Sequence, residues 1–598
     1  MTTAHPVTKR WRFAIWSVFV FALLLLLGLR LAAVLRWPEL SAPLGPVNPD
    51  AWLRLAQLRD WLAADNSFSH AVPRTNAPLG GVEIHWTRPL DVFLWGFYGL
   101  TPRNAPVDLR LMIAASLYPV VLCLVTAGLL TAATRKLFRH NHVLACTLLL
   151  LGATPYLSSY FSPGDADHHG LLSAIWCGII LLLLDLSRPC WKMLLAGGLL
   201  GALIWVSPEG LLLLALVIAM LALETMRRSR SEVKPAAFFL AIGAAVVVTA
   251  GVFMETPWKN ILARVNYDSL SIVHVYLCWQ IALASAGLVA ACRRWASISF
   301  RMTAGAVIGL ASLLALHRAY PRFFLGPFAD ADPYIFKNFL PFISEARPLL
   351  NLPFSQYAPS LLQPVLAMVL AGFAVYQSRS GSLRKLQVLM LAGLLVITLL
   401  LTLLQLRWAY YLAPLALILC GGLLPTLSVA ARRFSFAPRR WQPYLWIMVI
   451  FAYITGTAFA GSKPAGPQQG VACMNEIRFV IQTRQLQPLI GDDDTIFYTY
   501  EDVGGEMLFF TPYRIIASNY HREADGLRDL KAMREAPDLD SFHGLLKKRQ
   551  VGALLICPVY HPALFPPGAK TPGWLEKIGG LEFYQPAGNK PELYRVVD

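Results

Sequence analysis

Two carboxylates and two imidazoles lie within five consecutive residues of the sequence, as Asp165, Asp167, His168 and His169. Oxygen and imidazole ligands together suit Mn²⁺ or Mg²⁺ better than a structural zinc ion, which more often binds Cys or additional His. Asp167 and His169 can point to the same side of an extended turn, whereas Asp165 and Asp167 form a competing pair. The spacing therefore predicts a divalent-metal site, leaves both ligand pairs open and keeps His168 in reserve.

Asp50 is a second candidate for chemistry. It follows Pro49, and this pair predicts the start of a helix that runs to about Ala64. An Asp in the first turn favours the positive end of a helix dipole, and that role alone would explain it. Its position just outside the bilayer, on the same face as the Asp/His turn, also makes it a candidate for the metal site.

Two further charged residues lie at the edges of apolar segments. Arg407 interrupts apolar sequence at a membrane boundary, where an arginine either snorkels to the interface or offers a forked donor to a phosphate. Glu345 lies in the long polar loop 318–358, and loops of that length are usually functional or mobile. Glu345 either pairs with Arg347 or closes over a substrate.

The first outer loop returns to the membrane surface at His85, Trp86 and Arg88. Trp and Arg at that depth commonly anchor a protein at the interface, and here they could also contact a phosphate or a sugar. The turns at 207–210 and 255–259 are interpreted as ordinary connections between spans.

In the tail, residues 506–522 predict a strand, a turn and a strand of an α/β domain. The polar cluster at Tyr520, His521 and Arg522 either binds an acceptor or carbohydrate or is a hydrogen-bonded structural cluster.

These residues are positioned by a chain that is mostly apolar. Its 598 residues are 56% hydrophobic, and the mean hydropathy is +0.51. Many runs reach about 18 residues or more, which predicts a polytopic α-helical membrane protein. The predicted spans are 13–35, 108–133, 143–160, 171–187, 193–206, 210–226, 235–254, 272–292, 302–317, 359–377, 386–405, 409–430 and 443–461. This odd number of spans places the two termini on opposite sides of the bilayer.

The net charge of +17 is explained by topology, because the basic residues gather in short loops at alternate turns. This positive-inside pattern predicts a cytoplasmic N-terminus in a bacterial inner membrane and requires no nucleic-acid surface. Loops 36–107 and 318–358, the turn 161–170 and the tail are then periplasmic. The chain divides into a membrane domain, 1–461, and a soluble periplasmic domain, 462–598. Cys473 and Cys557 lie in that tail and could pair in an oxidising compartment, although sequence alone does not show the required geometry.

Together these pieces resemble the catalytic subunit of oligosaccharyltransferases, of the bacterial and archaeal single-subunit type, in the GT-C class of glycosyltransferases. Residues 343–348, Ile-Ser-Glu-Ala-Arg-Pro, are similar to the family string SVSEHQP at its Ser, Glu and Pro. Residues 406–413 resemble the family's Arg-aromatic-x-x-Tyr-Leu-Ala segment. Asp167-His168-His169 resembles the Asp-x-His metal pair of archaeal members. The resemblance covers the whole topology, and the order and sidedness of these motifs carry it.

The resemblance implies an inverting, metal-dependent glycosyltransferase with a polyprenyl-linked glycan as donor and a protein, lipid or polysaccharide as acceptor. It implies a Mn²⁺ or Mg²⁺ ion held by Asp50, Asp167 and His169, with the donor phosphate near Arg407. Asp50 would also orient or deprotonate the acceptor. Glu345 would hold the acceptor or join the outer shell of the metal.

The chain departs from the family at the WWDYG motif, which reads the hydroxyl residue of an Asn-x-Ser/Thr acceptor. Its counterpart falls at 499–505, where Asp502 and Gly504 fit and the paired tryptophans are absent. This departure favours an alternative, a GT-C enzyme that moves a single sugar from polyprenyl monophosphate to a lipid or polysaccharide. A non-enzymatic lipid or polysaccharide transporter is a second alternative. It would need charged residues within the spans.

Overall fold

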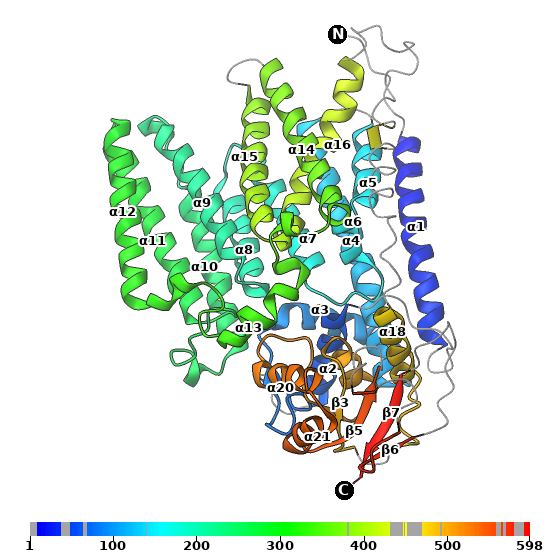
Figure 1. Ribbon diagram of the computed structural model, residues 1–598. Helices are drawn as coiled ribbons and strands as arrows, with labels where there is room; N and C mark the ends of the chain where they lie inside the picture. Colours follow the sequence, from blue (N-terminus) through cyan, green and yellow to red (C-terminus); the bar gives the residue numbers. More distant parts are fainter. Residues whose placement is uncertain are drawn as a thin grey trace.

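The computed structural model describes residues 9–36, 48–63, 69–139, 142–378, 382–430, 447, 449–450, 469–490, 493–557, 564–565, 570–578 and 591–597. These residues form a large helical bundle and, at one end of it, a smaller region that contains a β-sheet (Figure 1). The C-terminus lies in this smaller region, far from the N-terminus.

Long apolar helices make up the bundle. Among the described residues, nine helices are long and apolar enough to cross a membrane, and a bent pair, Val143–Ala153 and Pro155–Phe161, makes a tenth candidate span. Two shorter apolar helices lie at His169–Leu183 and Cys190–Val206. These segments correspond to the first twelve predicted spans. The thirteenth, 443–461, lies almost entirely outside the described residues.

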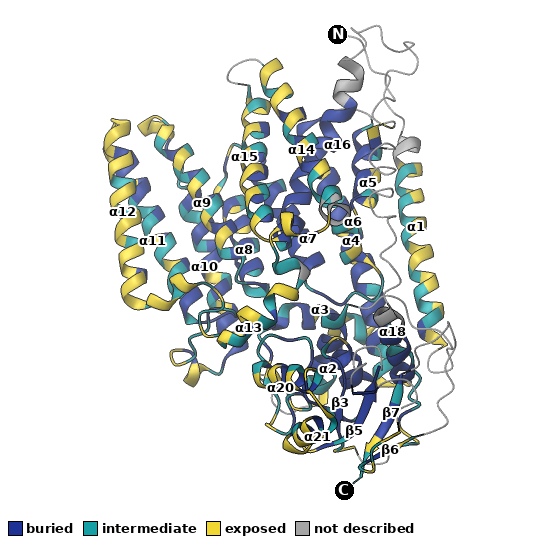
Figure 2. Cartoon of the chain, in the orientation of Figure 1, coloured by how far each residue is buried: buried dark blue, intermediate teal, exposed yellow. Residues whose placement is uncertain are grey.

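The helices of the bundle are α1 (Lys9–Leu35), α4 (Val107–Leu137), α5 (Val143–Ala153), α6 (Pro155–Ser158), α7 (His169–Leu183), α8 (Cys190–Val206), α9 (Gly210–Arg227), α10 (Ala236–Glu255), α11 (Ile272–Arg294), α12 (Ile298–Ala319), α14 (Phe354–Gln377), α15 (Leu383–Leu404) and α16 (Ala409–Ala430). Burial separates a protein-facing set from an outer set (Figure 2). In the most apolar 18-residue stretch of the span at Leu406–Pro425 every residue is buried, whereas in that of Ile298–Ala319 only 6% are.

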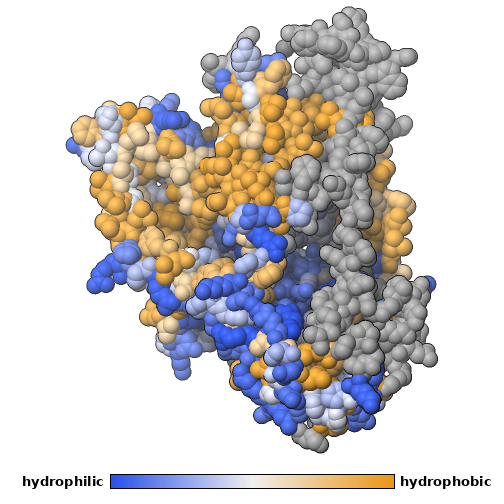
Figure 3. Space-filling model, viewed as in Figure 1, coloured by the Kyte–Doolittle hydropathy of each residue, from blue (hydrophilic) through white to orange (hydrophobic). Residues whose placement is uncertain are grey.

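The outer helices expose large apolar side chains such as Phe300, Val307 and Leu310. Figure 3 shows this apolar surface over the helices and a hydrophilic surface over the smaller region below them. An apolar belt of this extent would be unfavourable in water, so it faces lipid. The prediction of a polytopic helical membrane protein is therefore confirmed.

A layer of short elements lies between the bundle and the sheet region. It contains α2 (Pro49–Ala63), the hairpin of β1 (Ala71–Val72) and β2 (Val82–Glu83), α3 (Arg88–Gly99) and α13 (Pro333–Asn338). The helix predicted from Asp50 to about Ala64 is thus confirmed as α2. The predicted loop 318–358 contains α13 and several 3-10 turns before α14 begins at Phe354.

The sheet region has the strand order β4–β3–β5–β7–β6, from β3 (Ile496–Tyr498), β4 (Arg514–Ile515), β5 (Val551–Ile556), β6 (Leu575–Lys577) and β7 (Glu592–Val596). β3 pairs in parallel with β4 and β5, and β7 pairs antiparallel with β5 and β6. Helices α18 (Gln469–Gln482), α19 (Gly504–Phe510), α20 (Ala524–Arg534) and α21 (Leu539–Lys548) complete the region. The predicted α/β character of the tail is confirmed.

The strand predicted to begin at Glu506 is wrong, because residues 504–510 form helix α19. This helix packs on α2, where Trp52 contacts the rings of Phe509 and Phe510 at 5.1 and 4.8 Å between centroids. Burial against α2 therefore overrides the strand preference of the aromatic residues. Of the second predicted strand, only the two residues of β4 form a strand.

Cys473 and Cys557 form a disulfide that joins α18 to the end of β5, with 6.0 Å between their Cα atoms. The pairing considered from the sequence is therefore present in the structure.

Candidate active site

The Asp/His turn lies where α6 gives way to α7, and its backbone is held in place locally. Gly164 has φ +100°, a conformation that glycine adopts readily, and its N–H donates to the carbonyl of Ala115 at 3.1 Å. Helix α7 then begins at His169, so Asp167 lies just before the positive end of the helix dipole. Asp167 and His169 are both buried, at 2% exposure.

Asp167, His168 and His169 form the group whose ligand atoms converge within 4.8 Å of one another. Asp167 Oδ1 lies 2.6 Å from Nδ1 of His168, and Asp167 Oδ2 lies 3.3 Å from Nε2 of His169. The pair of Asp167 and His169 is therefore brought together, and His168, kept in reserve from the sequence, belongs to the same group.

Glu345 reaches this group from a 3-10 turn in the loop between α12 and α14. Its Oε2 lies 3.2 Å from Nε2 of His169, and it does not pair with Arg347, which donates to the Pro341 carbonyl. The carbonyl of Arg347 accepts from the N–H of Leu406 at 3.0 Å, which ties this loop to the segment that carries Arg407.

The spacing of these atoms fits a small divalent ion. Two ligands of an ion such as Mg²⁺, in octahedral geometry at 2.0–2.1 Å, lie about 3 Å apart. The two contacts of His169 Nε2, with oxygens of Asp167 and Glu345, are close to that separation. Carboxylate and imidazole are also a donor set that Mn²⁺ accepts.

Asp50 lies in the first turn of α2 and lines the same cavity as His168 and His169. Burial, together with the nearby charges of Asp167 and Glu345, raises the pKa of Asp50 to about 8. A cation at this place would offset that repulsion and favour the ionised carboxylate. Asp165 is not among the residues that line the cavity.

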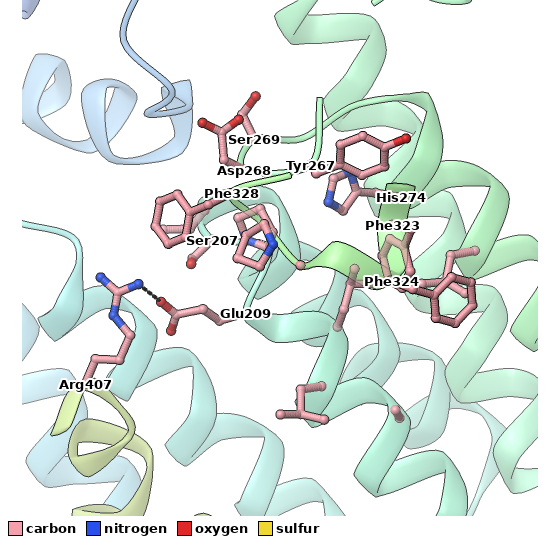
Figure 4. A pocket seen from close by; sticks show the side chains of 18 of the residues that line it. Ser207, Glu209, Tyr267, Asp268, Ser269, His274, Phe323, Phe324, Phe328 and Arg407 are labelled. Carbon is pink, nitrogen blue, oxygen red and sulfur yellow. Dashed lines mark ion pairs between the residues drawn. The ribbon is translucent and has the colours of Figure 1, made fainter. Parts of the chain in front are cut away.

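Arg407 lies in a 3-10 turn between α15 and α16 and faces two carboxylates. Its Nη1 is 3.1 Å from Glu209 Oε1, and its Nη2 is 4.0 Å from Glu345 Oε2. Figure 4 shows the ion pair with Glu209 at the wall of the cavity. Tyr410 donates its hydroxyl hydrogen to Glu209 Oε2 at 2.6 Å. Interpreting residues 207–210 as an ordinary turn therefore missed Glu209, whose only sequence signal is a carboxylate directly before a span on the same face.

A cavity of about 1240 Å³ joins these residues. One wall is polar and carries the Asp, Glu, His and Arg side chains described above. The other wall is apolar and lies between α9, α11 and α12, where it is lined by Leu212, Ile281, Leu288, Ile308 and Leu313. The cavity therefore has one end suited to charged groups and another suited to hydrocarbon.

The sheet region reaches the cavity through Asn519, Tyr520 and His521. Tyr520 hydrogen-bonds His85, and its ring stacks on the His85 ring at 5.5 Å between centroids. Burial and the neighbouring His521 hold the pKa of His85 well below its usual range, so this imidazole is neutral.

Arg522 and Arg88 have structural partners instead. Arg522 binds both carboxylate oxygens of Asp268, at 2.9 and 2.6 Å. The Arg88 guanidinium pairs with the buried Asp91 at 2.8 Å and does not line the cavity, whereas Trp86 does. Residues 499–505 do not line the cavity, although Gly505 packs against the first turn of α2, and Glu501 pairs with Arg534 at 2.7 Å.

No protein-family profile matches the sequence, and no curated protein matches it. Solved structures do match the fold. The crystal structure of the apo oligosaccharyltransferase of Archaeoglobus fulgidus is similar over 93% of this chain and 70% of that chain, with 13% identity and a TM-score of 0.65. The same archaeal enzyme, AglB, in complex with an inhibitory peptide and a dolichol-phosphate, is similar over 90% of this chain and 69% of that chain, with 12% identity and a TM-score of 0.60.

A third structure of the Archaeoglobus fulgidus enzyme, in complex with zinc and sulfate, is similar over 89% of this chain and 67% of that chain, with 13% identity and a TM-score of 0.56. The fold predicted from the resemblance to oligosaccharyltransferases, a GT-C membrane bundle with a C-terminal α/β region, is therefore confirmed.

Proposed function

We propose that this protein is an integral-membrane inverting glycosyltransferase that moves a glycan from a polyprenyl-(pyro)phosphate donor to an acceptor on the periplasmic face. The observation that carries the proposal is the convergence of residues from four segments far apart in sequence: Asp50, His169, Glu345 and Arg407 line one cavity, and Asp167 contacts His169 at 3.3 Å. Charged groups gathered at the boundary of a membrane bundle are costly, and such clusters usually mark a functional site.

The shape of the cavity supports a lipid-linked donor. Its apolar wall between α9, α11 and α12 fits a polyprenyl chain, and a phosphate at its polar end would lie beside the forked guanidinium of Arg407. The similar archaeal enzyme binds a dolichol-phosphate.

Asp50, Asp167 and His169 would hold the metal ion, and His168 lies within reach of the same group. A bound Mn²⁺ or Mg²⁺ would neutralise charge that develops on the leaving phosphate. Zinc in the similar archaeal structure supports a divalent ion at such a site without fixing which one.

The side chains of this protein then divide the remaining work. Asp50 would also orient the acceptor or accept its proton, because it lies at the cavity wall. Attack from the side opposite the phosphate inverts the anomeric carbon. Glu345 holds the acceptor or joins the outer shell of the metal, since its carboxylate faces His169.

The acceptor would contact the rings of His85, Trp86, Tyr520 and His521, which line the same cavity as the charged side chains. Since residues 499–505 lack the paired tryptophans and do not line the cavity, sequon reading by a WWDYG-type motif is not supported, and a lipid or polysaccharide acceptor becomes the stronger of the predicted alternatives. A transporter is less well supported, because the charged residues of the cavity gather at one end of the bundle.

In this proposal residues 1–461 form the membrane domain, residues 462–598 form the periplasmic domain, and the N-terminus is cytoplasmic in a bacterial inner membrane.

The experiment compares glycoproteins and glycolipids, by mass spectrometry, from cells that carry the wild-type chain, D50A, D167A or D165N. We expect D50A and D167A to lower transfer by about 100-fold or more, because each removes a charge aimed at the reacting centre. D165N should keep more activity than D167A, since Asp165 is not part of the group of converging ligand atoms formed by Asp167, His168 and His169. Full metal-dependent transfer in D50A and D167A, at normal expression, would refute the proposal.

A further inference from the structure

Glu209 occupies a position that the proposed mechanism does not use. It lies between α8 and α9, and its side chain points at Arg407 across the polar end of the cavity (Figure 4). One carboxylate oxygen pairs with Arg407 at 3.1 Å, and the other accepts from the hydroxyl of Tyr410 at 2.6 Å. Both of its oxygens are therefore engaged by residues of the segment that would receive the donor phosphate.

Arg407 has no substitute in this cavity. Among the described residues that line the cavity, it is the only arginine or lysine. Its guanidinium is already shared between Glu209 and, at 4.0 Å, Glu345. A phosphate that enters the cavity must therefore compete for a cation that two carboxylates already neutralise.

A phosphate and the Glu209 carboxylate cannot share Arg407 favourably. Glu209 holds Nη1 of Arg407 through one oxygen, whereas a phosphate can bind the guanidinium through two oxygens in its fork geometry and would take the same N–H groups. Two anions held side by side on one guanidinium also repel each other, and the lower dielectric constant of the protein strengthens this repulsion. The phosphate would therefore displace Glu209 from Arg407, while the Tyr410 hydroxyl can retain the displaced carboxylate.

We propose that Glu209 is a built-in competitor of the donor phosphate: its carboxylate holds Arg407 in the empty enzyme and leaves when the phosphate binds. The inference rests on the proposed function, because it assumes that Arg407 receives an anionic lipid headgroup. Glu209 is then a positioning residue that sets donor affinity and keeps a half-buried guanidinium paired between turnovers.

Neutralising Glu209 should increase the affinity of the protein for an anionic donor. A residue that supports the donor site loses affinity when it is neutralised, whereas neutralising a competitor increases affinity. The fraction of enzyme with a free Arg407 rises in E209Q, and apparent affinity scales with that fraction. We therefore expect E209Q to bind an anionic polyprenyl lipid about five- to tenfold more tightly than the wild type.

The test measures binding of undecaprenyl phosphate, and separately of inorganic sulfate, to the full-length chain in detergent by its tryptophan fluorescence. E224Q is the matched control, since Glu224 lies near the end of α9 and pairs with Arg188 at 3.1 Å, whereas Glu209 directly precedes the first residue of this helix. Tighter binding of both anions by E209Q, with E224Q unchanged, supports the inference. Unchanged or weaker binding by E209Q overturns it.

Two further variants make failure interpretable. R407Q should weaken binding of both anions; if R407Q binds as the wild type does, the donor site in the proposed function is misplaced and the inference fails with it. If E209Q does not fold, E209A removes the same carboxylate and must also bind more tightly. A steady-state assay adds a second readout, in which the KM for the donor falls in E209Q because its cation is free.

Discussion

At the scale of single residues, the buried carboxylates of this protein do two different things. Asp91 is fully buried and binds Arg54 at 2.9 Å and Arg88 at 2.8 Å, so its charge is matched and it stabilises the fold. Asp50 has no ion pair with any residue that the structure describes, although Asp167 and Glu345 lie close enough to raise its pKa. A buried carboxyl whose pKa is raised by burial and by neighbouring carboxylates is a candidate functional group, and in this respect Asp50 differs from Asp91.

Glu523 offers a test of a buried carboxyl outside the candidate active site. It accepts hydrogen bonds from the N–H and the hydroxyl of Ser518, and burial raises its pKa to about 7. The folded state therefore holds this proton more tightly than the unfolded state. Its contribution to the free energy of unfolding is complete below about pH 4.3 and falls by about 3 kcal/mol as the pH rises through 7.

We expect E523Q to be more stable than the wild type at pH 8 and to lose part of the decline between pH 5 and pH 8. Thermal unfolding followed across this range measures the effect. E576Q, on an exposed position of β6, is the control and should follow the wild-type curve. A wild-type midpoint that rises from pH 5 to pH 8, with E523Q parallel to it, would contradict the assignment.

At the scale of elements, close packing of α8 on α10 positions the loop that carries Glu209. Gly243 faces α8, where an added Cβ would overlap the carbonyl oxygen of Leu194, and a Cβ at Gly197 would overlap the carbonyl of Leu240. Without a hydrophobic driving force between helices in lipid, such small residues allow the backbone contact that holds the pair together.

We predict that G243V separates α8 from α10 and destabilises the protein by more than about 3 kcal/mol, because the clash is with backbone atoms that cannot rotate away. The yield of monodisperse protein in detergent and its melting temperature measure the loss. G393V makes the same change in α15, where a Cβ meets nothing within 4 Å, and should behave as the wild type. Normal yield and melting of G243V would show that the helices are not held this closely.

At the scale of the whole molecule, the C-terminal region is docked on the layer that carries Asp50. Arg59 donates to the carbonyl of Leu508 at 2.7 Å, and Arg74 donates to that of Thr511 at 2.7 Å. The Asp268–Arg522 pair makes a second connection, between the segment before α11 and the region that supplies Tyr520 and His521. The cavity is therefore completed by two parts of the chain that must dock on each other.

The Cys473–Cys557 disulfide closes this docked region over 84 residues of sequence. Removing such a cross-link typically costs about 2–4 kcal/mol, because it frees the unfolded chain. We therefore expect C557S to lower the melting temperature and to reduce transfer in proportion to the folded protein left. C190S, at an exposed free thiol, is the control. If C557S melts as the wild type does in non-reducing buffer, the disulfide does not stabilise the region.

The sequence by itself determined the membrane class and most of the candidate site. Apolar runs identify spans because lipid cannot satisfy backbone groups, and that rule needs no tertiary information. Asp50, Asp167, His169, Glu345 and Arg407 stand out for the same reason, since a charge beside a span is costly wherever the chain folds.

Only the tertiary structure decided the partners of these residues. Glu209 and Tyr410 are separated by 201 positions, and no local pattern indicates that a carboxylate between α8 and α9 faces Arg407. Arg88 turns away from the cavity because Asp91 is buried beside it, and residues 504–510 become a helix because α2 receives their aromatic face. The sequence could single out candidate site residues because the free-energy cost of a charged side chain beside a span depends on local sequence alone. Which charged side chains pair with each other depends on how distant elements pack.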